Sequence, residues 1–99
     1  MQGLSINIEM LREVANFVGN EANNYDSNLT ELYNKFNALS NFWSGPDYDA
    51  ASAVMTQNKQ PLLDLGITLH EISTALNNIS DDYQAKINKS AAQYEMEER

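Results

Sequence analysis

Apolar residues recur along the first half of the chain at alternating spacings of three and four residues. A mean spacing of about 3.5 residues keeps such positions along one side of an α-helix. The pattern therefore predicts a helix over about residues 8–42, with Asn7 as its N-cap and Ile6 packed on Leu11. The stripe consists of Ile8, Leu11, Ala15, Val18, Ala22, Tyr25, Leu29, Leu32, Phe36, Leu39 and Trp43.

A second stripe with the same spacing runs through the other half of the chain and weakens beyond Tyr83. It predicts a second helix over about residues 48–89, followed by a flexible C-terminal tail over about residues 90–99. Asn58 is its polar exception, either a buried residue that fixes the helix register or a half-exposed one. The stripe consists of Tyr48, Ala51, Met55, Asn58, Leu62, Leu65, Leu69, Ile72, Leu76, Ile79 and Tyr83.

A short segment between the two stripes contains Gly45 followed by Pro46. Glycine takes the left-handed conformation that ends many helices, and proline fits the first turn of the next helix. Asp47 and Asp49 would then lie at the positive end of the second helix dipole. We therefore expect an antiparallel helical hairpin with its turn at residues 43–47.

Pro61 lies inside the second stripe. A proline there removes a backbone donor and costs roughly 3 kcal/mol in a straight helix. Either the helix kinks around Pro61, or it stops near Lys59 and restarts. The spacing of apolar residues continues across Pro61 without a phase shift, which favours the kink.

Length and pattern together predict a single all-α domain over residues 1–99. Each helix would be roughly 50 to 60 Å long, so the hairpin is a thin rod that leaves much of both stripes in contact with water. A second hairpin would cover these faces and complete a four-helix bundle. The residues expected in the core and the dimer contact are Leu11, Val18, Tyr25, Leu29, Leu32, Phe36, Leu62, Leu65, Leu69, Ile72 and Leu76.

The composition excludes several classes of partner. Fourteen acidic and six basic residues give a net charge of −8, which disfavours binding to nucleic acid and to anionic lipids. The chain has no cysteine and therefore no disulfide. The first twenty residues lack a basic region followed by an apolar one, and no long apolar run exists. We expect neither a cleavable signal peptide nor a membrane span.

Candidate chemistry is sparse in this sequence. His70 is the only histidine, so a zinc site would need several carboxylates around it. There is no phosphate-binding loop and no nucleophile elbow. We expect no metal, no cofactor, no small-molecule substrate and no enzymatic activity. The tyrosines on the two stripes are interpreted as core residues rather than as a binding surface.

A Trp-x-Gly motif, Trp43-Ser44-Gly45, lies between the two predicted helices near the midpoint of the chain. With this motif the chain resembles, over essentially its whole length, the WXG100 (ESAT-6-like) family, whose two helices are joined by such a turn. The opening segment, residues 6–12, also looks like the family's entry into its first helix. Near the C-terminus, Tyr94 and Glu98 match the family's Tyr-x-x-x-Asp/Glu export signal. On a helix these two residues would share one face.

The resemblance implies a small non-enzymatic protein that a type VII secretion system exports as a folded helical dimer, without a cleavable signal peptide. The partners it implies are a second hairpin, identical or related, and a membrane-bound FtsK/SpoIIIE-type ATPase. Trp43, Gly45, Tyr94 and Glu98 would form the recognised surface. The exported protein could act as a virulence or interbacterial factor. The alternative is an intracellular adaptor or chaperone that pairs with and targets a larger secreted effector.

Overall fold

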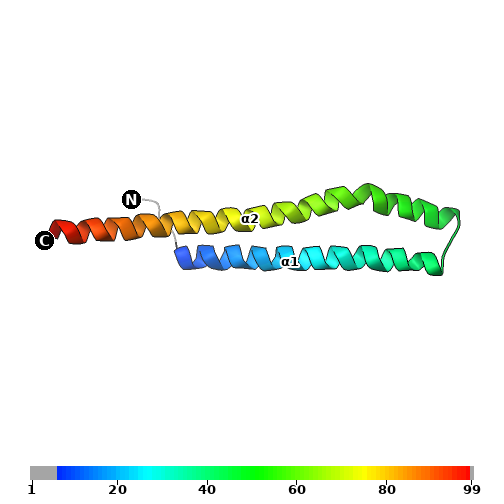
Figure 1. Cartoon of the computed structure of the whole chain (residues 1–99), viewed down its shortest axis with the longest axis horizontal. Coiled ribbons are helices and arrows are strands. Elements are labelled where there is room, and N and C mark those ends of the chain that lie inside the picture. Colours follow the sequence, from blue (N-terminus) through cyan, green and yellow to red (C-terminus); the bar gives the residue numbers. More distant parts are fainter. Residues whose placement is uncertain (1–6, 99) are drawn as a thin grey trace.

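The chain folds into two long antiparallel helices joined by one turn (Figure 1). The computed structural model describes the backbone of residues 7–98 and the side chains of residues 7–89. Helix α1 spans Ile8–Ala38, a 3₁₀ turn η1 spans Leu39–Asn41, and helix α2 spans Pro46–Glu98. The hairpin measures 81 × 20 × 16 Å. The prediction of an all-α, rod-like hairpin is confirmed.

Helix α1 begins at Ile8 with the side-chain cap expected of Asn7. Asn7 Oδ1 accepts a hydrogen bond of 3.0 Å from the Met10 N–H, and the Asn7 carbonyl accepts one of 2.9 Å from the Leu11 N–H. These bonds satisfy donors that would otherwise be unpaired at the start of a helix. The predicted contact of Ile6 with Leu11 lies outside the described residues.

The turn differs from the prediction in how it uses Gly45. Helix α1 ends at Ala38 and tightens into η1, where the Leu39 carbonyl accepts from the N–H groups of both Phe42 and Trp43, each at 2.9 Å. Gly45 then has a φ of 117°, which only glycine adopts readily. Its carbonyl accepts from the Asp49 N–H at 3.0 Å. Gly45 therefore starts α2 instead of ending α1.

Helix α2 is continuous across Pro61 and bows away from α1 in its first half, the green segment of Figure 1. Because proline lacks an N–H and its ring crowds the carbonyl four residues earlier, a bend is the expected response. Two tyrosine hydroxyls of α1 hold the bent region. Tyr33 donates to the Met55 carbonyl and Tyr25 to the Leu62 carbonyl, each at 2.6 Å. Helix α2 is therefore kinked around Pro61 and not broken there.

Helix α2 also continues past Lys89 to Glu98, where a flexible tail was expected. The apolar stripe weakens in this segment, so the pattern gave no reason to extend the helix. Its residues, however, are mostly strong helix formers, namely Ala, Gln, Glu and Met, without Gly or Pro. Intrinsic propensity therefore continues the helix where packing no longer requires it. The end of α2 extends beyond the start of α1 (Figure 1).

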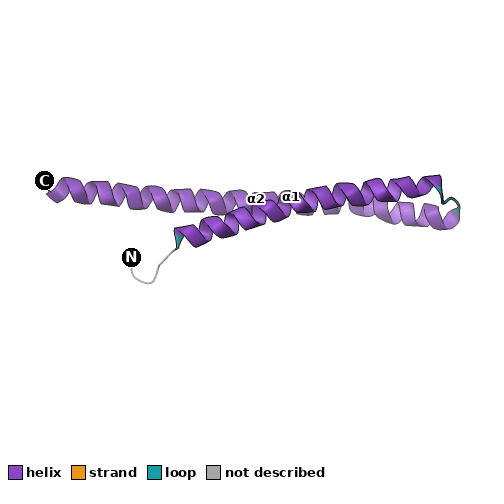
Figure 2. Cartoon of the chain, turned by 90° about the horizontal axis from the view of Figure 1, so that it is seen from below, coloured by secondary structure: helices purple, strands orange, loops and turns teal. Residues whose placement is uncertain are grey.

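The two helices approach closely through small residues. Ala15 and Ala22 of α1 and Ser80 of α2 are fully buried. Ser73 Oγ donates to the Ala15 carbonyl at 2.8 Å. A Cβ atom placed on Gly19 would lie 2.8 Å from Ser73 Oγ, so a larger residue there would force the Ser73 side chain to shift. In the perpendicular view the helices cross at a small angle (Figure 2).

Candidate functional site

The Trp-x-Gly turn is closed by three aromatic rings. Phe36 of α1 stacks on Tyr48 of α2, with ring centroids 5.6 Å apart and an interplanar angle of 8°. Trp43 meets Tyr48 edge-on, with the two ring centroids 5.4 Å apart and an interplanar angle of 77°. Such pairs add specificity to the burial of apolar area. Trp43 is nevertheless 39% exposed, so the indole is oriented by the fold and still accessible.

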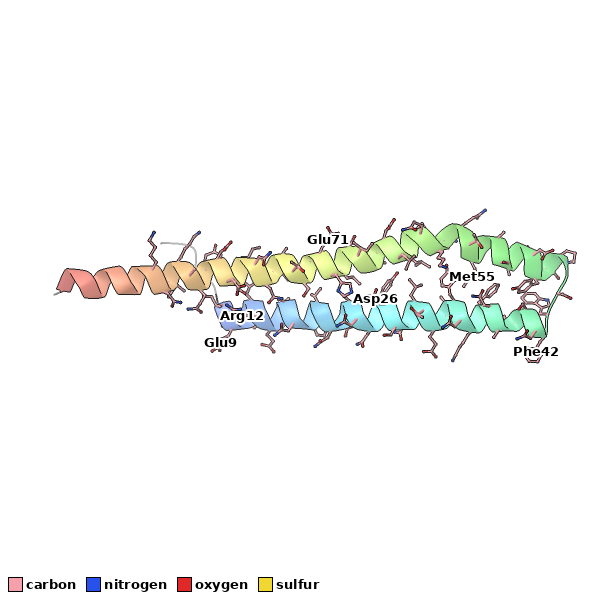
Figure 3. All side chains as sticks on the ribbon, in the orientation of Figure 1. Glu9, Arg12, Asp26, Phe42, Met55 and Glu71 are labelled. Carbon is pink, nitrogen blue, oxygen red and sulfur yellow. The ribbon has the colours of Figure 1, made fainter. Side chains whose placement is uncertain are left out.

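Phe42 is the most exposed large apolar side chain of the described residues, at 88%. It points away from α2 at the end of the rod (Figure 3). Phe42 lies off the apolar stripe, so the apolar pattern predicts no role for it. Its position next to Trp43 in the sequence is the signal that could have drawn attention to it. Phe42 and Trp43 together place two aromatic side chains at the turn.

Charge around the turn is acidic. Asp47 and Asp49 lie in the first turn of α2, where the helix dipole favours negative charge. Lys35 in the last turn of α1 pairs with Glu31 at 3.0 Å, and both side chains are largely exposed. A partner of the turn would therefore meet aromatic rings flanked by carboxylates.

The residues of the predicted C-terminal signal lie at the other end of the molecule. The backbone at Tyr94 and Glu98 is helical and belongs to α2, while their side chains lie outside the described ones. One helical turn separates them, which places them on the same face. Because α2 is one long helix, Trp43 and Gly45 lie near one end of the rod, and Tyr94 and Glu98 near the other (Figure 1). A single hairpin does not bring the four residues together.

Two sides of the hairpin follow from helix geometry. Each residue of an α-helix is rotated by about 100° from the one before it. Relative to a residue that faces the partner helix, the residue four positions later is therefore rotated roughly 40° to one side. The residue three positions later is rotated roughly 60° to the opposite side. The positions rotated to the first side contact each other across the helices: Gly19 meets Ser73, and Asp26 meets Gly66. Lys59 Nζ lies 5.6 Å from the Tyr33 ring centroid. We call this the closed side.

Of the positions rotated the other way, Val18 and Tyr25 are half-buried, and a row of others is open to solvent. We call this the uncovered side; the large side chains of its open row are 42 to 50% exposed, and they are Leu32, Leu39, Leu65, Ile72 and Ile79. A shallow hollow of about 210 Å³ lies between the helices there, with Leu32 and Leu62 in its lining. Each predicted stripe therefore consists of two rows of residues. One row packs against the other helix of the hairpin, and the other row stays exposed to solvent.

The other predicted stripe residues are distributed accordingly. Leu29 is buried, and those that are half-buried are Leu11, Val18, Tyr25, Phe36, Leu62, Leu69 and Leu76. Asn58 is exposed, and its Nδ2 donates to the Val54 carbonyl of its own helix at 2.8 Å. Of the two interpretations of Asn58, the structure therefore supports the solvent-exposed residue over the buried one that fixes the helix register.

The sole histidine joins the two helices on the closed side. His70 Nε2 lies 2.6 Å from Asp26 Oδ2, and both side chains are about half exposed. Among the described side chains, no group of three or more His, Asp or Glu residues could hold a metal ion. Nor, over residues 7–98, does either helix combine the length and apolar character that crossing a membrane would require.

A helical hairpin with Trp-x-Gly at its turn defines a class of small helical proteins of the secreted type. The chain belongs to the WXG100 family, described as proteins of 100 residues with WXG, which it matches over residues 3–86. The matched region contains Trp43 and Gly45 and ends before Tyr94. No match to the chain is found among curated proteins.

Two solved structures share this fold. The first is a secreted protein EsxB from Bacillus anthracis, 27% identical, with a TM-score of 0.73; the match covers 87% of this chain and 98% of that one. The second is a mutant of the same protein in which a glutamate is replaced by glutamine, also 27% identical with a TM-score of 0.73. That match covers 89% of this chain and 97% of the other. The hairpin of the present chain is thus similar to that of a secreted protein over nearly its full length.

Proposed function

We propose that this protein is a non-enzymatic substrate of a type VII secretion system, exported as a folded helical dimer. One observation carries the proposal: the Trp43-Ser44-Gly45 turn is presented at the end of a rigid rod, with the indole held against Tyr48 and still accessible. The family and the similarity to a secreted protein support it. A signal displayed in this way exists only in the folded state.

The receptor we propose is a membrane-bound FtsK/SpoIIIE-type ATPase. Trp43 and Gly45 would form one part of the recognised surface, and Tyr94 and Glu98 the other. Since the two parts lie at opposite ends of one hairpin, an antiparallel dimer would place one turn and one C-terminal segment near each end of the assembly. The dimer, rather than the single chain, would then be the unit that the ATPase binds.

The dimer is favoured by the uncovered side. A row of Leu and Ile side chains that is about half exposed along a rod is more apolar surface than an isolated hairpin normally leaves in water. Proteins of this family generally form dimers. A related WXG100 hairpin could serve as the partner in place of a second copy.

A second candidate function is an intracellular adaptor that pairs with a larger secreted effector and directs it to the secretion system. The uncovered side favours this candidate too, because an effector helix could cover it. The two functions differ in the final location of the protein. A virulence or interbacterial role after export would apply to the first function.

The deciding experiment compares the culture supernatant with the cell pellet, in cells with and without the secretion ATPase. We expect the tagged protein in the supernatant of cells that contain the ATPase and only in the pellet of cells that lack it. A cytoplasmic marker protein controls for lysis. Protein that stays in the pellet of cells with an active secretion system would contradict export and favour the adaptor.

A further inference from the structure

We propose that Phe42 is a further contact residue for the secretion receptor, and that its phenyl ring enters an apolar pocket of the receptor bordered by positive charge. This role rests on the proposed function and adds a residue outside the Trp-x-Gly motif to the recognised surface. It also defines the chemistry of the receptor surface that meets the turn. Phe42 is 88% exposed, compared with 39% for Trp43 beside it.

The fold gains almost nothing from the Phe42 side chain. A side chain that is 88% exposed keeps nearly all of its apolar area in water after folding. Among the described side chains, Tyr48 pairs with the rings of Phe36 and Trp43, and Phe42 takes part in neither pair. A small polar residue at position 42 would serve the hairpin equally well. The phenyl ring is therefore available for a contact outside the hairpin.

The backbone around Phe42 is nevertheless fixed. Phe42 caps η1 with φ −126° and ψ −8°, and its N–H donates to the Leu39 carbonyl at 2.9 Å. The N–H of Trp43 donates to the same carbonyl at 2.9 Å, and the indole meets the Tyr48 ring of α2. A partner that binds Phe42 does not have to order a loose loop, which lowers the entropic cost of recognition. Trp43, which turns inward, thus holds in place the residue that turns outward.

The direction of Phe42 selects the kind of partner that can reach it. The side chain points away from α2 at the end of the rod (Figure 3). A second hairpin on the uncovered side would lie beside both helices and would leave this end of the rod free. The partner of Phe42 is therefore a molecule that approaches the end of the rod, where the proposed receptor meets the Trp-x-Gly turn.

The charge near Phe42 determines which surface fits. Asp47 and Asp49 are exposed in the first turn of α2 and contribute −1 each, while residues 36–58 contain no Lys or Arg. An anionic lipid surface would repel this stretch, and also the whole chain with its net charge of −8. A protein pocket with apolar walls and an Arg or Lys at its border would accommodate the ring and the carboxylates together.

Two phenylalanines give a matched test. Phe42→Ala and Phe17→Ala each remove a largely exposed phenyl ring; Phe17 is 62% exposed and lies in α1, far from the turn. The purified chains are mixed with inside-out membrane vesicles from cells that contain the secretion ATPase and from cells that lack it. Sedimentation of the vesicles measures the bound fraction over a range of protein concentrations. Thermal unfolding compares the stability of each variant with that of the wild type.

We expect Phe42→Ala to bind vesicles that contain the ATPase at least about tenfold more weakly than the wild type, because burying a phenyl ring contributes at least that factor. Phe17→Ala should bind within about threefold of the wild type. Phe42→Leu keeps most of the apolar volume and should retain most of the binding. The melting temperature of the Phe42 variants should be unchanged, since the ring makes so little contact within the hairpin.

Equal binding of Phe42→Ala and the wild type, or an equal loss in Phe17→Ala, would overturn the proposal. No binding of the wild type to vesicles with the ATPase would overturn it too. Binding through Phe42 to vesicles without the ATPase would mean that the ring contacts lipid instead. A wild-type chain that binds the ATPase vesicles through Phe42 and yet stays in the cell would contradict only the proposed export. Export of the Phe42→Ala variant at the wild-type level would contradict only the role of Phe42.

Discussion

The two halves of the hairpin are held together in different ways. In the half near the start of α1, the helices approach closely through alanine, glycine and serine, and Arg12 joins Asp81 at 2.9 Å. In the half near the turn, α2 bows outward and the wider space is filled by tyrosine, phenylalanine and tryptophan rings. The first half has little tolerance for added volume. The second half leaves its aromatic residues partly exposed, so it can display a signal.

The largest effect we expect is on secretion, with only a small effect on stability. Trp43→Ala should reduce secretion at least about tenfold, because the indole is the accessible part of the turn. It should lower the free energy of unfolding by only about 1 to 2 kcal/mol, less than a fully buried tryptophan would cost. Secretion is measured in the supernatant and stability by thermal unfolding. Leu63→Ala is the control, since it also removes an exposed apolar side chain, far from the turn. Normal secretion of the Trp43→Ala variant would show that the turn is not part of the surface that the receptor recognises.

The far end of α2 gives the second test of separable signal and scaffold. Tyr94→Ala should abolish most secretion, and Glu98→Ala should reduce it less, because a ring contributes more contact area than a screened surface charge. Glu98→Asp should be mild. None of these changes should alter the melting temperature, since α1 begins opposite an earlier part of α2. A lowered melting temperature would show that the segment also stabilises the fold.

Adding volume to the closely packed half should destabilise the hairpin. Ala22→Leu inserts three carbon atoms at a fully buried position between the helices, and we expect a loss of about 1 to 3 kcal/mol. Ala38→Leu is the matched control, because Ala38 is exposed at the end of α1 near the turn. Chemical unfolding monitored by circular dichroism measures both. A hairpin that accepts Leu at position 22 without loss would contradict the tight packing of this half.

Gly66 lies at the boundary between the two halves. Replacing a helical glycine with alanine usually stabilises by about 0.5 to 1 kcal/mol. Here a Cβ atom would lie 2.7 Å from Asp26 Oδ1 and 3.2 Å from the Tyr25 ring. We expect Gly66→Ala to give no net gain in the free energy of unfolding. In a His70→Gln background, where Asp26 is freer to move, the same change should be more favourable. Chemical unfolding of the four chains measures both effects. Identical effects in both backgrounds would show that the Asp26–His70 contact is not coupled to Gly66.

The smallest effects should come from the surface ion pairs. Arg12 joins the two helices, so Arg12→Ala should cost up to about 1 kcal/mol, whereas Lys35→Ala, which breaks a pair within α1, should cost about 0.3 to 0.5 kcal/mol. Both costs should shrink as salt is added. Thermal unfolding at low and high salt measures them. A larger loss for Lys35→Ala would contradict the greater importance of contacts between the helices.

The fold could be predicted from the sequence because large apolar side chains repeat at helical spacing on both sides of Trp43 and Gly45. The contacts on the closed side could not be predicted in this way. Its contacts use Gly19, Gly66 and Ser73, residues whose small size matters only once the partner helix is known. The apolar pattern shows that rows such as Leu65 and Ile72 avoid water, but it does not show which helix, or which molecule, covers them.

The ends of the elements depended on local chemistry that the apolar pattern does not encode. Gly45 was expected to end the first helix, and instead its positive φ starts the second. The helical character of residues 90–98 follows from intrinsic propensity rather than from an apolar stripe. The separation of Trp43 from Tyr94 along the rod follows from the unbroken length of α2, which the expected tail had obscured.

The narrow cross-section of the hairpin sets a physical requirement for any route out of the cell. Its short dimensions are 20 and 16 Å, against a length of 81 Å. A folded rod moving lengthwise through a pore needs an opening of about that width, and a pair of rods side by side needs nearly twice the shorter dimension. One helix separated from its neighbour would need only about 10 to 12 Å. The diameter of the exit pore therefore determines whether the protein crosses as a pair, as one hairpin or as a chain whose helices have come apart.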